Sequence, residues 1–315
     1  DRFVEAVKLP LPEGARVAGL AVQIASLVSS SSWGVGDLAD LQRVLARTAE
    51  AGVGLVLTSP VHAPRFGVPP QSSPYYPSSR VFHNPIHLAV ETVPGFARLA
   101  KERPSLTDDL RRQARSSLVN GTIDRQRVWE AKRAILAGIW QEGKWDQDSD
   151  AGSAFDHYCR EHARLLQPFS LFAARSEIDP RPWWEWPEPW CHPSSAGPEA
   201  ARAELDELAA FHRWLQWLLH TQLQQAGCTG GLMMDLAVGV DPAGADAWYW
   251  QDSIVPGLEL GAPPDDLNPD GQAWGFPVFD PEALGRTGFA PLLEPLRAAM
   301  AHCKAVRVDH VLGLF

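Results

Sequence analysis

Four short apolar runs are the feature that most constrains the fold of this chain. Each is rich in Val, Leu, Ile or Met and bounded by Gly or Pro, and together they occupy residues 19–27, 52–60, 231–240 and 305–314. Nearly continuous apolar runs of this length are typical of parallel strands that are covered on both faces. We therefore expect a parallel sheet in which these four strands are buried.

Helical periodicity accompanies the strands. After the first run, Asp37 is a plausible N-cap, apolar residues recur on one face between Leu38 and Ala49, and Gly52 ends the pattern. Residues 281–303 have a helical pattern between the third and fourth runs. The alternation of strand and helix predicts βαβ units and an α/β fold.

The connection between the second and third runs is too long for a plain loop. It contains a Pro/Trp-rich stretch at 179–187 and helical patterns at 123–141, 155–176 and 199–226. We interpret residues 1–95 as two β/α units, 96–229 as an inserted, mostly helical subdomain, and 230–315 as the third and fourth strands. Four strands cannot close a barrel that needs eight. The fold is therefore either an open α/β sheet or about half of a (β/α)8 barrel.

Composition excludes several classes of partner. The 315 residues carry a net charge of -10, which disfavours nucleic acid and anionic lipid. No apolar run reaches the roughly 18 residues of a membrane span. Four scattered cysteines without a C-x-x-C pair favour reduced thiols in a cytoplasmic protein over disulfides or a zinc site. The N-terminus has neither Met nor a signal-peptide pattern, so we expect the sequence to begin inside a longer product.

The strand Val306-Arg307-Val308-Asp309-His310 carries the most informative side chains. Side chains alternate across a strand, so Arg307 and Asp309 share one face. A buried guanidinium beside a carboxylate would keep Asp309 ionised, as a carboxylate nucleophile requires. The alternative is an ion pair that only sets the strand register.

Three further features carry polar side chains suited to a ligand. Asp235 lies in an apolar strand and needs either a ligand hydroxyl or a structural partner. The loop 261–275 carries Asp265, Gln272 and Trp274, and is either a sugar-binding loop or a structured linker. Tyr75 lies on a proline-stiffened loop at 71–80, where it suits stacking on a ligand.

Taken together, these segments resemble the amylomaltase (4-α-glucanotransferase) family, glycoside hydrolase family 77 of the α-amylase clan. The matching segments, in family order, are 23–27, 32–37, 60–63, 73–75, 79–80, 84–85, 235–238, 261–275 and 307–310. The Trp-rich insertion and residues 244–248 are most similar to actinobacterial members.

The resemblance implies a role for each matching residue. Asp309 corresponds to the nucleophile that forms a covalent glucosyl-enzyme, and Arg307 to the arginine that orients it. Asp235 and Tyr75 correspond to residues that bind and stack on the sugar beside the cleaved bond. The loop with Asp265, Gln272 and Trp274 would fold over the bound glucan, and His310 belongs to the same motif as Asp309.

Two departures limit the resemblance. The family's acid/base glutamate and third catalytic aspartate lie on later strands, beyond residue 315, and no acidic residue here matches them. The segment after Val240 is longer than in many members, so Asp241 and Asp246 receive no role. We therefore expect these 315 residues alone to be inactive and poorly stable, because half a barrel exposes an open strand edge.

For the parent protein, the resemblance implies a cytoplasmic 4-α-glucanotransferase acting on α-1,4-glucans and maltooligosaccharides, without a metal or organic cofactor. One alternative is a hydrolase of the same clan, which uses water as acceptor. Another is a catalytically inactive glucan-binding protein.

Overall fold

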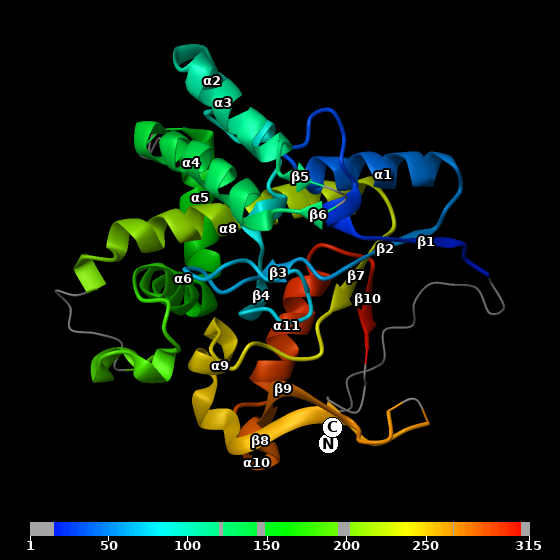
Figure 1. The fold of residues 1–315 in the computed structure, drawn as a ribbon, viewed down its shortest axis with the longest axis vertical. Helices are drawn as coiled ribbons and strands as arrows, with labels where there is room; N and C mark the ends of the chain where they lie inside the picture. Colours follow the sequence, from blue (N-terminus) through cyan, green and yellow to red (C-terminus); the bar gives the residue numbers. More distant parts are fainter. Residues whose placement is uncertain (1–15, 120–121, 144–148, 195–201, 267, 310–315) are drawn as a thin grey trace.

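Four parallel strands form the central sheet, in the order β1 (Gly19–Val22), β2 (Leu55–Thr58), β7 (Leu232–Leu236) and β10 (Ala305–Val308) (Figure 1). The computed structural model describes residues 16–119, 122–143, 149–194, 202–266 and 268–309. Each predicted apolar run supplies one strand, and every neighbouring pair is parallel. The prediction of a parallel α/β sheet is confirmed.

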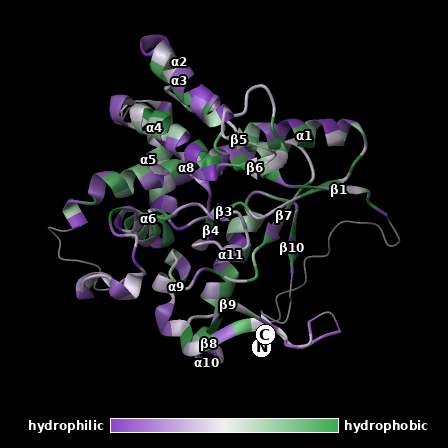
Figure 2. Ribbon diagram, in the orientation of Figure 1, coloured by the Kyte–Doolittle hydropathy of each residue, from purple (hydrophilic) through white to green (hydrophobic). Residues whose placement is uncertain are grey.

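Burial differs between the central and the outer strands. Most residues of β2 and β7 are buried or half-buried, and Figure 2 shows much of the sheet in hydrophobic colours. In contrast, β1 is largely exposed, with Leu20 at 44%. The prediction that all four strands are buried is therefore wrong for β1. The reason is its position at the sheet edge, where a strand has only one paired neighbour.

Helix α1 (Leu38–Glu50) begins where the sequence predicted. The Asp37 carboxylate accepts the amides of Ala39 and Asp40, each at 3.0 Å, and the Asp40 side chain accepts the Asp37 amide. This capping box satisfies amides that lack partners within the helix. The helix starts with this cap, and Leu38, Leu41 and Leu45 face the core.

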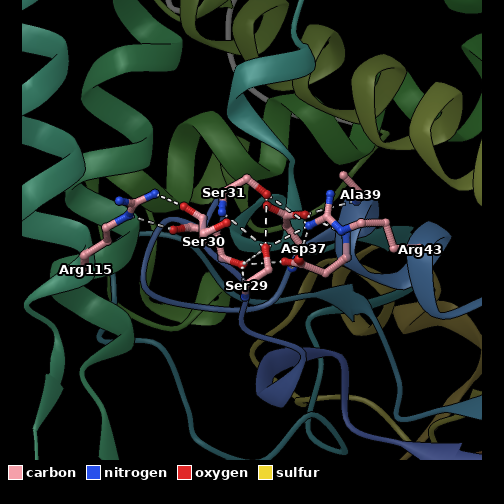
Figure 3. Close-up of polar contacts among 9 residues, drawn as sticks. Ser29, Ser30, Ser31, Asp37, Ala39, Arg43 and Arg115 are labelled. Carbon is pink, nitrogen blue, oxygen red and sulfur yellow. Dashed lines mark hydrogen bonds and ion pairs between the residues drawn. The ribbon is translucent and has the colours of Figure 1, made fainter.

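The serine-rich turn before α1 is held from two sides, as Figure 3 shows. Arg43 of α1 donates to Ser29 Oγ at 2.8 Å. Arg115, at the end of α3 (Pro104–Arg115), donates to the carbonyls of Ser30 and Ser32. The turn that leads from β1 to α1 is thereby fixed to two helices.

The long connection is largely helical, as predicted, and its helices group on one side of the sheet in Figure 1. Its principal helices are α2 (Phe96–Glu102), α3, α4 (Arg125–Gly143), α5 (Asp150–Glu161), α6 (Ala163–Ile178) and α8 (Asp206–Thr229). Short 3-10 turns lie at η2 (Pro85–His87), η3 (Val90–Thr92), η4 (Trp183–Glu185) and η5 (Glu188–Trp190), and η1 (Ile24–Ser26) follows β1. The single helix predicted at 155–176 is divided at His162 into α5 and α6.

Helix α8 connects the helical region to the sheet. It packs against α1 and α6 and leads directly into β7. One apolar cluster runs from Leu41 of α1 through Trp214 and Leu218 of α8 to Leu232 of β7. The boundaries at residues 95 and 229 stay predictions, but the helical region and the sheet share this core.

In the described part of the chain, three two-stranded ribbons lie outside the central sheet. They pair β3 (His62–Ala63) with β4 (Ser79–His83), β5 (Leu118–Val119) with β6 (Thr122–Ile123), and β8 (Ile254–Ala262) with β9 (Gln272–Phe279). The predicted loop 261–275 is thus the end of the β8–β9 hairpin. Gly and Pro residues interrupt the periodicity of β8 and β9, so the sequence pattern did not predict them. Among the described residues, these two strands pair only with each other.

The remaining helices of the described residues lie just before and after this hairpin in the chain. They are α9 (Ala245–Tyr249), η6 (Gln251–Ser253), α10 (Pro281–Arg286) and α11 (Ala290–Met300). The single helix predicted at 281–303 is divided because Gly288 and Phe289 both have positive φ, at 62° and 61°. Left-handed backbone interrupts an α-helix.

Candidate active site

The carboxyl ends of β7 and β10 bring Asp235 and Arg307 together. The two strands are parallel, and their register pairs Arg307 directly with Asp235. Side chains at directly paired positions of neighbouring strands point to the same face of the sheet. In (β/α)8 enzymes the active site lies at this carboxyl end. The sequence placed both residues on strands, but only the sheet register makes them neighbours.

A continuous set of hydrogen bonds joins Tyr75, Asp235, Arg307 and Asp309, which we call the Asp235 cluster. Tyr75 Oη donates to Asp235 Oδ2 at 2.8 Å. Arg307 Nη1 donates to the same oxygen at 2.8 Å, and Nη2 donates to Asp309 Oδ2 at 2.8 Å. The guanidinium therefore holds two carboxylates at once. The predicted pairing of Arg307 with Asp309 is confirmed.

The other carboxylate oxygen of Asp235 has unused hydrogen-bonding capacity. The side chain is only 3% exposed, and Oδ1 meets no hydrogen-bond donor among the described residues. A buried acceptor without a donor is costly, and such groups in native proteins call for an explanation. A ligand hydroxyl is one group that would satisfy it.

Charge and burial set the state of the neighbouring groups. The Asp235 carboxylate, followed by that of Asp309, raises the pKa of Arg307, so the guanidinium stays charged. Burial raises the pKa of Tyr75, and its hydrogen bond to Asp235 adds to this effect. Tyr75 is therefore a neutral phenol that acts as a donor at neutral pH.

The Arg307–Asp309 pair is more exposed than the sequence suggested. The two side chains are 38% and 53% exposed, because β10 is an edge strand of the described sheet. The prediction of a buried pair is therefore wrong for this structure. His310, the next residue of the motif, lies outside the described residues.

A cavity of about 480 Å³ opens beside the Asp235 cluster. Its walls come from the ends of β1, β2, β7 and β10 and from the segment that follows β2. Tyr75, Asp235 and Arg307 contribute to the wall. The volume lies in the range usual for small-molecule sites.

Several polar residues of this wall received no role from the sequence, among them His62, Arg65, Tyr76 and Asp241. His62 Nε2 accepts the amide of Ala237 at 3.3 Å, and burial lowers the pKa of His62 to about 3. This neutral imidazole braces the end of β7. The position of Asp241, five residues after β7, was the available signal for its place near the strand ends.

The predicted covering residues lie apart from the Asp235 cluster. Gln272 and Trp274 are on strand β9, where Trp274 Nε1 donates to Gln272 Oε1 at 3.0 Å. The Asp265 carboxylate accepts the amide of Asn268 at 2.6 Å. In the described part of the chain, none of the three lines the cavity. The hairpin approaches it through Phe276, whose ring centroid is 5.4 Å from that of Tyr76.

The described residues also bear on metal binding, membrane spanning and disulfide formation. Within the described ranges, no group of three or more His, Cys, Asp or Glu side chains is arranged to hold a metal ion. No helix of the described residues has the length and apolar character needed to cross a membrane. The four cysteines, all within those ranges, are free thiols.

Comparisons with known proteins agree with this geometry. The model of glycoside hydrolase family 77, described as 4-alpha-glucanotransferase, matches residues 22–315. The 4-alpha-glucanotransferase of Mycobacterium tuberculosis is 37% identical over an alignment of 324 positions, which covers 98% of this chain and 44% of that protein. The Haemophilus influenzae 4-alpha-glucanotransferase is 30% identical over 97% of this chain and 47% of its own length. The chain thus spans about half the length of these relatives.

Solved structures show the same fold. Amylomaltase from Corynebacterium glutamicum superimposes with a TM-score of 0.82 at 33% identity, over 95% of this chain and 41% of that one. Amylomaltase from Streptococcus agalactiae, solved in complex with acarbose, gives 0.76 at 19% identity, over 95% and 60% of the two chains. The second likeness concerns the fold alone. The four-stranded sheet and its helices are those of the corresponding part of an amylomaltase barrel.

Proposed function

Because the chain belongs to glycoside hydrolase family 77, the 4-alpha-glucanotransferases, we propose that the whole protein transfers α-1,4-glucan segments to an acceptor glucan or glucose. The observation that carries this proposal is the Asp235 cluster at the carboxyl end of the sheet. It joins two carboxylates, a guanidinium and a phenol beside a cavity. Polar groups of this kind match the hydroxyls of a sugar.

Asp309 is the proposed nucleophile. Its side chain is 53% exposed and is held by Arg307, which leaves the carboxylate accessible while fixing its direction. Attack on the anomeric carbon would form a covalent glucosyl-Asp309 and release the reducing-end piece. The 4-hydroxyl of a second glucan would then displace Asp309, so that two inversions retain the α configuration.

Arg307 is the proposed orienting residue, and Asp235 and Tyr75 the proposed binding residues for the sugar at the cleaved bond. Asp235 offers Oδ1 to a hydroxyl. Tyr75 is 39% exposed, which leaves its ring accessible for stacking on the sugar. A retaining mechanism needs a second carboxyl group as acid and base. No described residue is assigned that role.

Asp265, Gln272 and Trp274 are proposed to cover the bound glucan. Their place on the β8–β9 hairpin, which contacts Tyr76 through Phe276, supports this role. Covering the site would exclude water and favour a sugar acceptor. His310 is proposed to bind the substrate, on the basis of the family motif alone.

The proposed ligands are α-1,4-glucans and maltooligosaccharides, and the proposed location of the enzyme is the cytoplasm. Four free thiols and a net charge of -10 support an intracellular protein that does not bind nucleic acid or anionic lipid.

Asp309→Asn in the full-length protein tests the mechanism. We expect it to abolish disproportionation of maltotriose while maltotriose binding, measured by calorimetry, survives. Asp156→Asn, an exposed aspartate on α5, is the matched control and should retain full activity. Undiminished glucose release by Asp309→Asn would refute the nucleophile assignment. Wild-type products that lack a ladder of longer oligosaccharides would favour a hydrolase instead.

A further inference from the structure

The cavity has a second set of polar side chains on its wall. Arg65, Tyr76 and Asp241 all line it, together with Tyr75, Asp235 and Arg307. Each set contains one tyrosine, one aspartate and one arginine. The two tyrosines are adjacent in the chain, and the two aspartates follow one another on β7 and the segment after it. The tyrosine and the aspartate of both sets thus come from the same two segments, whereas Arg65 and Arg307 come from different ones.

The Asp241 carboxylate is fixed by the backbone around it. Its Oδ1 accepts the amide of Ala243 at 2.8 Å, and its own amide donates to the Pro77 carbonyl at 2.8 Å. Arg65 Nε lies 3.4 Å from Asp241 Oδ2, and the two side chains are 20% and 10% exposed. The position and direction of this ion pair are therefore determined before any ligand arrives.

The Pro/Trp-rich stretch 179–187 forms hydrogen bonds with Arg65 and with the residue after Asp241. Arg65 Nη1 donates to the Pro180 carbonyl at 3.2 Å, and Trp183 Nε1 donates to the Pro242 carbonyl at 2.9 Å. Trp186, buried at 4% exposure, anchors the segment in the core. The insertion thus supports one wall of the cavity through residues 65 and 242.

Several polar atoms of this second set have unused hydrogen-bonding capacity. Among the described residues, the Tyr76 hydroxyl, Arg65 Nη2 and Asp241 Oδ2 take part in no hydrogen bond, and the last has only the ion pair with Arg65 Nε. Burial, followed by the nearby Asp241 carboxylate, raises the pKa of Tyr76, so its hydroxyl stays protonated. A phenol, a guanidinium edge and a carboxylate offer donors and acceptors together.

We propose that Arg65, Tyr76 and Asp241 form a second sugar subsite, which binds the glucose unit next to the one held by Asp235 and Tyr75. The guanidinium edge and the carboxylate match adjacent hydroxyls of a pyranose ring, as donor and acceptor respectively. The Tyr76 ring packs against Phe276 of the hairpin, which places the covering element over this subsite. The proposal rests on the proposed glucan-transfer function.

Asp241→Asn and Tyr76→Phe in the full-length protein test the subsite. Asn keeps the acceptor for the Ala243 amide, and Phe keeps the ring against Phe276, so both preserve packing. We expect KM for maltotriose to rise about ten-fold for Asp241→Asn and about three-fold for Tyr76→Phe, with kcat nearly unchanged. Maltoheptaose affinity, measured by calorimetry, should fall by similar factors.

Asp280→Asn is the matched control. The Asp280 side chain, like that of Asp241, accepts a backbone amide, that of Glu282 at 2.8 Å, but Asp280 does not line the cavity. The proposal is overturned if Asp241→Asn leaves KM within two-fold of wild type, or if Asp280→Asn raises KM as much. Wild-type protein that binds maltoheptaose without transferring it would refute the transferase function, and the calorimetric comparison would still decide the subsite. Wild-type protein that does neither would refute both.

Discussion

Arg307→Lys is the substitution whose consequence follows most directly from the geometry. The guanidinium donates from Nη1 to Asp235 and from Nη2 to Asp309, each at 2.8 Å. A lysine keeps the positive charge but has one nitrogen, so it cannot reproduce a planar fork that bridges two carboxylates. The variant therefore separates the role of charge from the role of geometry.

The size of the effect follows from the bond that is lost. A hydrogen bond to a charged group contributes about 1.5–3 kcal/mol. Solvent screens this pair, because Arg307 is 38% and Asp309 53% exposed, so we reduce the figure to about 1–2 kcal/mol. At about 1.4 kcal/mol for each factor of ten, kcat/KM should fall about 5- to 30-fold.

The assay is maltotriose disproportionation by the full-length protein, followed by glucose release. Arg181→Lys is the matched control, since Arg181 also bridges a carboxylate, that of Asp179, with contacts of 2.8 and 2.6 Å outside the cavity wall. We expect the control to retain wild-type kcat/KM. A decrease of less than two-fold for Arg307→Lys, or an equal decrease for the control, would refute the bridging role.

Two further predictions concern stability, measured as the urea midpoint of tryptophan fluorescence in the full-length protein. Gly34→Ala should lower the free energy of unfolding by more than about 3 kcal/mol, because φ is 74° and the new Cβ would lie 1.9 Å from the Ala114 carbonyl oxygen. Gly52→Ala, where φ is 77° and no atom lies near the new Cβ, should lower it by only about 1–2 kcal/mol. Equal losses would contradict the steric argument. Burial lowers the pKa of His87 and His302 to about 4, so the unfolded state binds more protons below pH 6.5 and stability should fall as pH decreases from 6.5 towards 4. Each of these two histidines should lower the free energy of unfolding by about 2 kcal/mol at pH 5. A urea midpoint that is constant between pH 7 and 5 would refute this pH dependence.

Local patterns determined much of the fold. The four apolar runs, the Asp37 cap and the pairing of Arg307 with Asp309 were all predicted, because each depends on residues a few positions apart. The hairpin β8–β9 and the break in the helix at Gly288 were missed. Strands β8 and β9, which pair with each other outside the central sheet, carry a weak periodic signal. The left-handed pair Gly288 and Phe289 does not alter the hydrophobic periodicity on which the helix prediction rested.

Only the tertiary structure decided which of these side chains meet. Tyr75 and Asp235 are 160 residues apart in sequence and 2.8 Å apart in space, and no local pattern encodes that contact. The family resemblance suggested that both bind a sugar. That Tyr75 and Arg307 share one oxygen of Asp235 follows from the register of β7 and β10 and from the packing of the segment that carries Tyr75. The sequence signal for Asp241 was only its position shortly after β7, and Arg65 carried none, because the importance of both arises from a cavity wall built by distant segments. Sequence thus determines the elements and their chemistry, while sheet register and loop packing determine which groups act together.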